Sequence, residues 1–332
     1  MSAGAKLVTR ATRASRAAAV AGAIALVAGA ALPWWAGSAS MRLLIEFYCF
    51  VIMAQMWNLL AGYGGLVSIG QQGFLGLGGY ALFALANHAG LNPFLCVPLA
   101  GLLAALVAWP SAKIVFRLRG GYFAIGTWAL AEVFRLILAN VSALGGGSGQ
   151  SLRAMASIAK STREPAAYLI AFAALVCALA AVYLLLRSRF GLALTAIRDS
   201  ERASESQGID TEFTKFWVYV VSAAGFGVVG AIYYMNILRI SPNAAFDVSW
   251  TAYVIFIVVI GGIGTIEGPI VGTLLFFVLR ETLSSYGSWY LIALGAIAVV
   301  TMLWFPAGLW GALSARFDLH LFPVRRWLRQ VP

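Results

Sequence analysis

The chain has 332 residues, of which 61% are hydrophobic and only 11% are charged, and its net charge is +11. Soluble globular proteins carry roughly a quarter charged residues, so this composition excludes an ordinary water-soluble domain. The basic residues flank apolar runs instead of gathering on a soluble domain. This distribution argues against nucleic-acid binding and is typical of the loops of membrane proteins.

Apolar runs close to the roughly 20 residues that a helix needs to cross a bilayer recur along the chain. We therefore expect an all-α fold: a polytopic integral membrane helical bundle with about ten membrane segments, some of them short or broken. Eight of these segments are expected at 17–36, 43–63, 70–87, 94–115, 121–140, 166–186, 216–238 and 288–306.

The first apolar run admits two interpretations. Four basic residues precede it and "AGSAS" follows it, as in a cleaved signal peptide. The run is long for the apolar part of a signal peptide, however, and it ends in Trp34 and Trp35, which are typical anchors at a membrane interface. These features favour a retained first span.

The apolar stretch 250–283 is interrupted by "GGIGTIEGP", whose glycines and proline disfavour a continuous helix. It forms either one broken span or two short segments, at 250–263 and 269–283. With two segments both termini are cytoplasmic, and sixteen of the 23 Lys and Arg residues fall on inner loops and tails. Because this distribution follows the positive-inside rule, the ten-segment model is favoured.

This topology divides the chain into a basic cytoplasmic N-terminus (1–16), a transmembrane domain (17–306) and a cytoplasmic C-terminal tail (307–332). A polar segment with balanced charges, 188–215, lies on the cytoplasmic side between two spans. It predicts one short amphipathic helix, because Phe190, Leu194 and Ile197 recur at helical spacing before Gly208. Helices that rest on lipid are biased towards Lys and Arg, so the mixed charge favours docking to a cytoplasmic protein.

The sequence offers little for catalysis. Its three cysteines and two histidines are scattered singly, and no carboxylate clusters with a base or a nucleophile. A phosphate-binding G-x-x-x-x-G-K-[ST] loop is missing, because none of the four lysines follows a glycine. We therefore expect no enzyme activity, no cofactor and no metal site, and this chain is not expected to bind ATP by itself.

Four motifs follow one another along the chain: "GGLVSIGQQGFLGLGGY" (64–80), "RLRGGYFAIGTWALAEVFRLI" (117–137), "FGLALTAIRDSERASESQGID" (190–210) and "VIGGIGTIEGPIVGTLL" (259–275). In this order they resemble the LivM-like membrane subunits of bacterial branched-chain amino acid ABC importers. The resemblance covers roughly residues 42–305. The chain departs from the family pattern at Gly121, where Asp is common, and at Asp199, where Glu is usual.

The resemblance implies a multi-pass permease subunit in the bacterial inner membrane that moves solute inward by alternating access. The partners that it implies are a sister permease subunit, two cytoplasmic ATPase subunits, a periplasmic substrate-binding protein and the lipid bilayer itself. The implied cargo is branched-chain or other hydrophobic amino acids, with urea, short amides and aromatic acids left open.

A secondary transporter driven by an ion gradient is the less favoured alternative. It would need ionisable groups or carbonyls at mid-membrane, and Glu132 with Arg135 is the only near candidate. These two residues lie three apart on one helix face and are expected to form an intramembrane pair, and a paired arginine opposes cation binding.

Three further groups of residues are candidates for function. The ATPase is expected to dock on Phe190, Gly191, Leu194, Ile197, Arg198, Asp199, Glu201 and Gly208. Either the translocation path or helix packing explains Ser68, Gly70, Gln71, Gln72, Gly73 and Gly76. An inner gate or a turn is expected at Gly261, Gly262, Glu267, Gly268 and Pro269.

Overall fold

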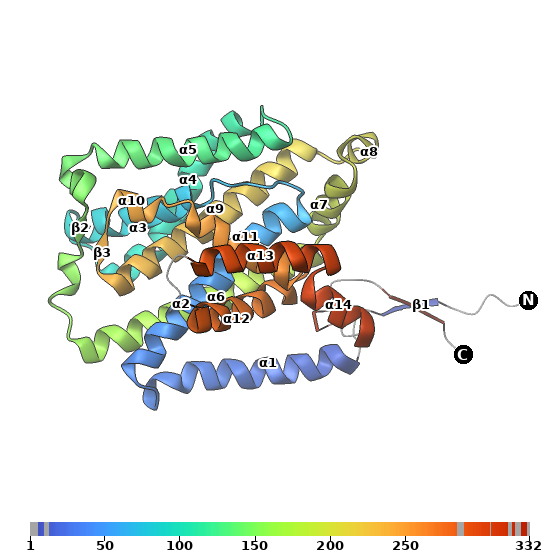
Figure 1. Ribbon diagram of the computed structural model, residues 1–332, viewed down its shortest axis with the longest axis horizontal. Coiled ribbons are helices and arrows are strands. Elements are labelled where there is room, and N and C mark those ends of the chain that lie inside the picture. The colour runs from blue at the N-terminus through green and yellow to red at the C-terminus, as the bar shows by residue number, and fades with distance from the viewer. Residues whose placement is uncertain are drawn as a thin grey trace, which may run out of the picture.

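The computed structural model describes residues 6–9, 13–283, 289–305, 307–317, 321–322 and 327–330. Almost all of them are helical, and the long helices run side by side, with α7 and α8 at one end of the bundle and β2 and β3 at the other (Figure 1). The expected all-α membrane bundle is confirmed.

Ten helices coincide with the ten predicted segments. They are α1 (Arg13–Ala31), α2 (Ser38–Asn58), α3 (Gln72–Asn87), α4 (Pro93–Val115), α5 (Gly121–Ala139), α6 (Lys160–Arg187), α9 (Thr211–Ile237), α11 (Ser249–Gly261), α12 (Glu267–Leu283) and α13 (Trp289–Trp304). The shorter helices are α7 (Arg189–Asp199), α8 (Glu201–Ser206), α10 (Pro242–Ala245) and α14 (Gly308–Phe317). Within the described residues, seven candidate spans are long and apolar enough to cross a membrane.

Two short helices, α11 and α12, form a tightly packed antiparallel pair where the sequence left one broken span as an alternative. A Cβ atom at Gly261 would lie 2.0 Å from the Gly268 carbonyl oxygen, and one at Gly272 would lie 2.0 Å from that of Ile257. Only glycine allows backbones to approach this closely, as in other membrane helix pairs. The chain therefore folds back within 250–283.

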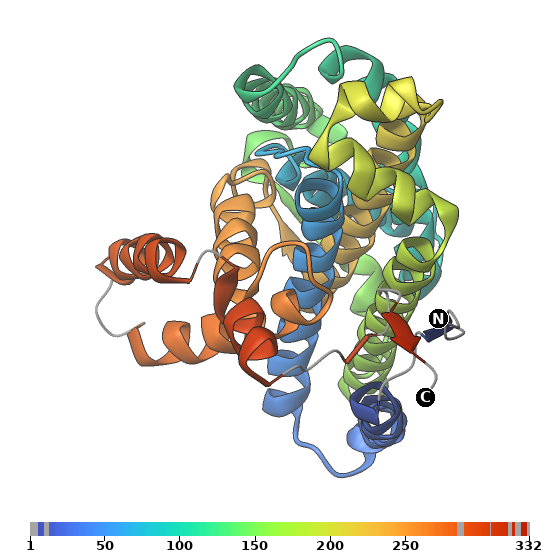
Figure 2. The ribbon, with the colours of Figure 1, turned by 90° about the vertical axis from the view of Figure 1, so that its right-hand side faces the viewer.

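The core of the bundle lies around α2 and α9, the two most buried of the candidate spans. Figure 2 shows α2 in the middle of the molecule. Residues 49–61 of α2 and its extension are buried on every side. Small residues bring α9 close to its neighbours: a Cβ atom at Gly227 would meet Ala104 of α4, and one at Gly230 would meet the Leu75 carbonyl of α3.

Other helices expose one large apolar face. In α4 the small residues Ala100, Ala104 and Ala108 are buried, whereas Leu102 and Leu106 are more than 60% exposed. Large aliphatic side chains outside and small ones inside are the pattern of a helix that faces lipid, because the bilayer solvates leucine as well as a protein interior does.

Both ends of the described chain lie at the end of the bundle that carries α7 and α8 (Figure 1). There β1 (Lys6–Thr9) pairs with β4 (Trp327–Gln330) in an antiparallel sheet. The segment 307–332, expected as a simple tail, contains α14 and β4. At the opposite end, β2 (Gln150–Ser151) pairs with β3 (Arg239–Ile240).

Candidate functional site

The segment between α6 and α9 forms two helices, α7 and α8, where the sequence predicted one. The break lies at Ser200, whose backbone is extended (φ −162°, ψ 108°) and whose hydroxyl accepts a hydrogen bond from the Ala203 amide at 3.4 Å. Serine competes with the helical backbone for hydrogen bonds and is a preferred first cap of a new helix. Ser188 caps α7 and Asp210 caps α9.

Burial divides the predicted docking residues into two groups. Those buried inside the subunit are Gly191, Leu194 and Ile197. Those exposed are Arg198, Asp199, Glu201 and Gly208, and Phe190 is half-buried. The buried group holds α7 against the bundle, so only the second group can meet a partner directly. Leu192 is 55% exposed on α7 and adds an apolar side chain to this surface, and the sequence analysis did not single it out.

Arg198 joins α7 to the end of α2. Its Nη1 atom donates to the Gly62 carbonyl at 3.0 Å, and its Nε and Nη2 atoms donate to Oδ1 of Asp199 at 3.1 and 3.0 Å. Gly62 belongs to a π-helical turn, Leu59–Tyr63, that continues α2, and such turns are frequent at functional sites. A displacement of α7 therefore acts directly on the end of the most buried helix.

The glycine-rich stretch predicted as an inner gate or a turn connects α11 to α12, and α2 holds it in place. The Asn58 side chain donates to the Thr265 carbonyl at 2.7 Å and accepts from the Gly264 amide at 2.8 Å. One turn earlier, Nε2 of Gln55 donates to the Ile266 carbonyl at 2.5 Å. The same end of α2 thus contacts both α7 and this turn.

The C-terminal segment is attached to this turn as well. Oε1 of Glu267, which is half-buried, accepts from the amides of Leu321 at 3.2 Å and Phe322 at 3.0 Å. The other predicted residues of the stretch are buried: Gly261, Gly262, Gly268 and Pro269. These two hydrogen bonds connect the turn to residues 321–322.

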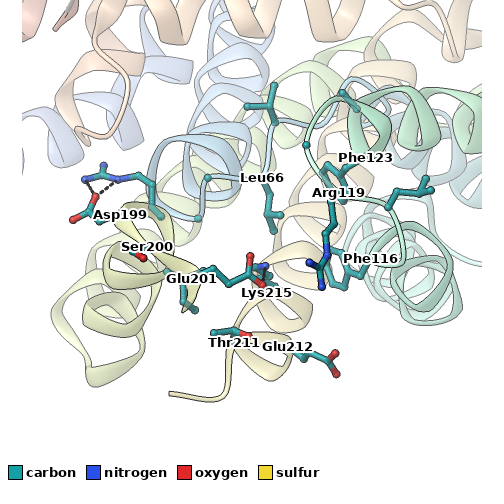
Figure 3. A pocket seen from close by; sticks show the side chains of 18 of the residues that line it. Leu66, Phe116, Arg119, Phe123, Asp199, Ser200, Glu201, Thr211, Glu212 and Lys215 are labelled. Atoms are coloured by element: carbon teal, nitrogen blue, oxygen red, sulfur yellow. Dashed lines mark hydrogen bonds and ion pairs between the residues drawn. The ribbon is translucent and has the colours of Figure 1, made fainter. Parts of the chain in front are cut away.

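A cleft of about 690 Å³ opens beside α7 and α8 (Figure 3). Its walls come from residues 64–67, the connection from α4 to α5, the α7–α8 pair and the start of α9. Lys215 of α9 forms an ion pair with Glu201 of α8 on one side, and Arg119 lies across from them. Leu66 projects into the cleft from the segment that follows α2 (Figure 3).

Between α2 and α3 the chain is non-helical at 65–71, and it enters the bundle interior there. Side chains satisfy its amides in three hydrogen bonds of 3.2–3.3 Å: Ile69 N to Thr127 Oγ1, Gly70 N to Ser68 Oγ, and Gln72 N to Thr251 Oγ1. Irregular backbone at membrane depth is tolerated only where protein buries it or where it lines a cavity.

The glycines of this region pack against other elements. A Cβ atom at Gly70 would lie 1.9 Å from the Thr127 carbonyl oxygen of α5. At Gly73 it would lie 2.9 Å from the Cβ atom of Ala131, and at Gly76 it would lie 2.5 Å from the Phe246 ring. In this conformation the three glycines serve close packing.

The polar residues of the same region differ from one another in their hydrogen bonding. Gln72 accepts from the Thr251 hydroxyl at 2.5 Å, and Ser68 Oγ accepts from the Gly70 amide. Gln71 is fully buried, yet neither its Nε2 nor its Oε1 atom has a hydrogen-bond partner among the described residues. An unpaired buried polar group costs about 1–3 kcal/mol, so Gln71 needs an explanation of its own.

Glu132 and Arg135 form an ion pair on α5, with Arg135 Nε at 2.8 Å from Oε1 of Glu132. Arg135 also donates through Nη1 to Oδ1 of Asn243 in α10 at 2.8 Å. The two charged side chains are 43% (Glu132) and 26% (Arg135) exposed on the surface of the bundle. Charged side chains within membrane spans usually face protein or water. This face of α5 therefore differs from the exposed face of α4, whose large side chains are apolar.

Two ion pairs join helices that lie far apart in the sequence. Arg280 of α12 binds Glu46 of α2 through both oxygens, at 2.7 and 2.9 Å. Arg42 of α2 binds Glu164 of α6, with Nε at 3.2 Å from Oε1. In the sequence each of these residues stands out only as a charge in or beside an apolar run. Its partner could not be predicted, because it lies more than 120 residues away. Within the described part of the chain, no group of three or more His, Cys, Asp or Glu residues could hold a metal ion.

These features define a multi-pass helical membrane protein with a polar helix pair fastened to one end of its bundle. A family model described as the permease component of branched-chain amino acid transport systems matches residues 39–305. The chain belongs to this family of transport permeases, and the resemblance carried by the four motifs is confirmed.

Individual members of the family align along most of the chain. The high-affinity branched-chain amino acid transport system permease protein LivM of Salmonella typhimurium is 31% identical over 311 residues, which cover 86% of this chain and 73% of that protein. LivM of Escherichia coli is 30% identical with the same coverage. The probable LivM of Methanocaldococcus jannaschii is 26% identical over 74% of this chain and 81% of its own length. No solved structure matches the chain.

Proposed function

We propose that the protein is a membrane-spanning permease subunit of an ATP-driven importer in a bacterial inner membrane. It passes solute from a periplasmic binding protein to the cytoplasm by alternating access. It works with a sister permease subunit and two cytoplasmic ATPase subunits that dock on α7 and α8, and both of its termini are cytoplasmic.

The observation that carries this proposal is the attachment of the α7–α8 pair to the core through Arg198. The pair offers an exposed polar surface for a partner, while Leu194 and Ile197 anchor it to the bundle. The hydrogen bond from Arg198 to Gly62 then links that surface to α2. Because protein interiors are closely packed, a displacement imposed on α7 is transmitted to the helices around α2 instead of being absorbed locally.

The proposed cargo is branched-chain or other hydrophobic amino acids. The proposal rests on membership of the family and on the transport function named for the two LivM proteins. Urea, short amides and aromatic acids remain alternative cargoes of the same mechanism. In such an importer the binding protein makes most of the selection.

Uptake measurements test the source of energy. Proteoliposomes would hold this subunit with the sister permease and the ATPases encoded beside it, and the binding protein would be added with labelled L-leucine. We expect uptake that requires both ATP and the binding protein. Uptake that a proton or sodium gradient drives without ATP would show a secondary transporter and overturn the proposal.

A matched pair of substitutions tests the docking surface. Leu192 is exposed on α7, and Leu91 is exposed at the opposite end of the bundle, so either can change without loss of core packing. Leu192→Asp should reduce co-purification of the ATPase subunits by about tenfold, a loss typical of one interface hot spot, whereas Leu91→Asp should leave it intact. Equal co-purification with both variants would place the docking surface elsewhere.

A further inference from the structure

Gln71 lies directly before α3, at the end of the non-helical segment that enters the bundle after α2. Its side chain is fully buried, and both of its polar atoms lack a hydrogen-bond partner among the described residues. The other buried carboxamides of α2 and α3 differ: Asn58 and Gln72 are hydrogen-bonded through their side chains, and Gln55 is bonded through Nε2. Gln71 alone in this group leaves both its donor and its acceptor unused.

The fold itself gains nothing from a carboxamide at this position. A leucine of similar size would fill the same space without the cost of stripping water from two polar atoms. In a protein that alternates between conformations, an unused donor and acceptor are explained if they are used in another conformation. A molecule that binds to Gln71 in that other conformation must then bring an acceptor for Nε2 and a donor for Oε1.

The cleft beside α7 reaches the beginning of the segment that carries Gln71. Leu66 and Val67 line the cleft, whereas Ser68, the next residue, is fully buried, so the cleft ends at the segment that carries Gln71. The segment begins just after Gly62, the residue held by Arg198 of α7. A movement of α7 is therefore expected to act on the chain between Gly62 and Gln71, part of which lines the cleft.

We propose that Gln71 is a solute-contacting residue of an occluded site at the break between α2 and α3, and that the solute is a small zwitterion. Its Nε2 atom donates to the carboxylate of the solute, and its Oε1 atom accepts from the ammonium group. Each charged group of an amino acid thereby gains a hydrogen bond from the protein, which offsets part of the cost of removing it from water. The inference rests on the proposed function, because it needs a conformation in which solute reaches the segment.

Two leucine substitutions separate this role from a structural one. Gln71→Leu removes only unpaired atoms, so the purified complex should melt at the same temperature as the wild type or at a higher one. ATP-driven uptake of labelled L-leucine should nevertheless fall by about tenfold or more, because the solute then loses its partner. Gln72→Leu removes a bonded side chain, so it should lower the melting temperature and reduce uptake only in proportion to the folded protein.

A third variant tests the charge of the solute. Gln71→Glu places a carboxylate where the solute carboxylate binds, so uptake should fall at least as far as in Gln71→Leu, while binding of L-leucine to the binding protein stays unchanged. Wild-type uptake in Gln71→Leu would overturn the inference and leave the proposed function standing. A lower melting temperature for Gln71→Leu would also overturn it, by revealing a structural role. Failure of the wild-type complex to use ATP would instead overturn the proposed function, and this inference with it.

Discussion

Arg198 is a partly exposed arginine on α7 whose guanidinium binds back to its own subunit. It donates to Gly62 and to Asp199 through three different nitrogen–hydrogen groups in one planar arrangement. Lysine carries the same charge but offers a single ammonium on a flexible stem, so it cannot hold this geometry. The residue is therefore better suited to transmit movement within the permease than to bind the ATPase.

We expect Arg198→Lys to uncouple the subunit without detaching it. Uptake should fall by about tenfold, the scale of one charge-assisted hydrogen bond, while the ATPase subunits still co-purify. The control is Arg202→Lys on the exposed surface of α8, which should keep both activities. Loss of ATPase co-purification in Arg198→Lys would instead assign the side chain to the partner interface.

Gly70 sits where two backbones come closest. A Cβ atom there would lie 1.9 Å from the Thr127 carbonyl, whereas one at Gly121, at the start of α5, would meet nothing within 4 Å. Gly70→Ala should therefore destabilise the subunit by about 1–3 kcal/mol through overpacking, and Gly121→Ala should be neutral or slightly stabilising. Thermal unfolding of the two purified variants compares them directly, and equal stability would contradict the close packing of segment 65–71 against α5.

At the scale of elements, α2 connects everything that the proposed mechanism moves. Its inner end meets α7 through Gly62 and the α11–α12 turn through Asn58 and Gln55. Glu267, at the end of this turn, holds the C-terminal segment through two hydrogen bonds. A load applied to α7 therefore reaches α3 along the chain and α11 and α12 across the turn.

Asn58 tests whether this connection matters. Asn58→Leu breaks two hydrogen bonds and leaves the Thr265 carbonyl and the Gly264 amide unpaired, which should cost about 1–3 kcal/mol of unfolding free energy. The matched control is Asn140→Leu, which removes one local bond at an exposed helix end and should cost less than about 0.5 kcal/mol. Equal melting temperatures for the two variants would show that the turn does not depend on α2.

At the scale of the whole molecule, the two described ends of the chain and the α7–α8 pair share one end of the bundle (Figure 1). An even number of crossings produces this arrangement. It agrees with the ten-segment model, in which the basic tails and the docking helices lie in the cytoplasm.

Labelling of intact cells tests this orientation. Cys177 is the one exposed cysteine among the described residues, so Cys177→Ser supplies the background. On it, Ala156→Cys lies near β2 and Ala203→Cys lies on α8, and both positions are exposed. A membrane-impermeant maleimide should label only the first in intact cells and both after lysis. Labelling of Ala203→Cys from outside would reverse the topology and remove the basis for ATPase docking.

Local patterns anticipated much of this structure. Apolar runs predicted the ends of the ten long helices described by the structure to within six residues, because a helix that crosses a bilayer needs a long apolar segment, which is visible in the sequence. The break of the docking helix at Ser200 was missed, since the capping preference of one serine competes with strong helix formers on both sides. The pairs Glu46–Arg280 and Arg42–Glu164 were missed because their members lie far apart in the chain.

By itself the sequence determined the class of protein, the positions of its helices and, through four ordered motifs, the family. These properties follow from local composition and spacing, which a linear chain carries in full. Only the tertiary structure decided which residues of α7 and α8 are buried, that Arg198 donates to the Gly62 carbonyl, and that Gln71 has no hydrogen-bond partner among the described residues. Such properties depend on contacts between atoms of distant segments, and these contacts are fixed only when the interior is closely packed.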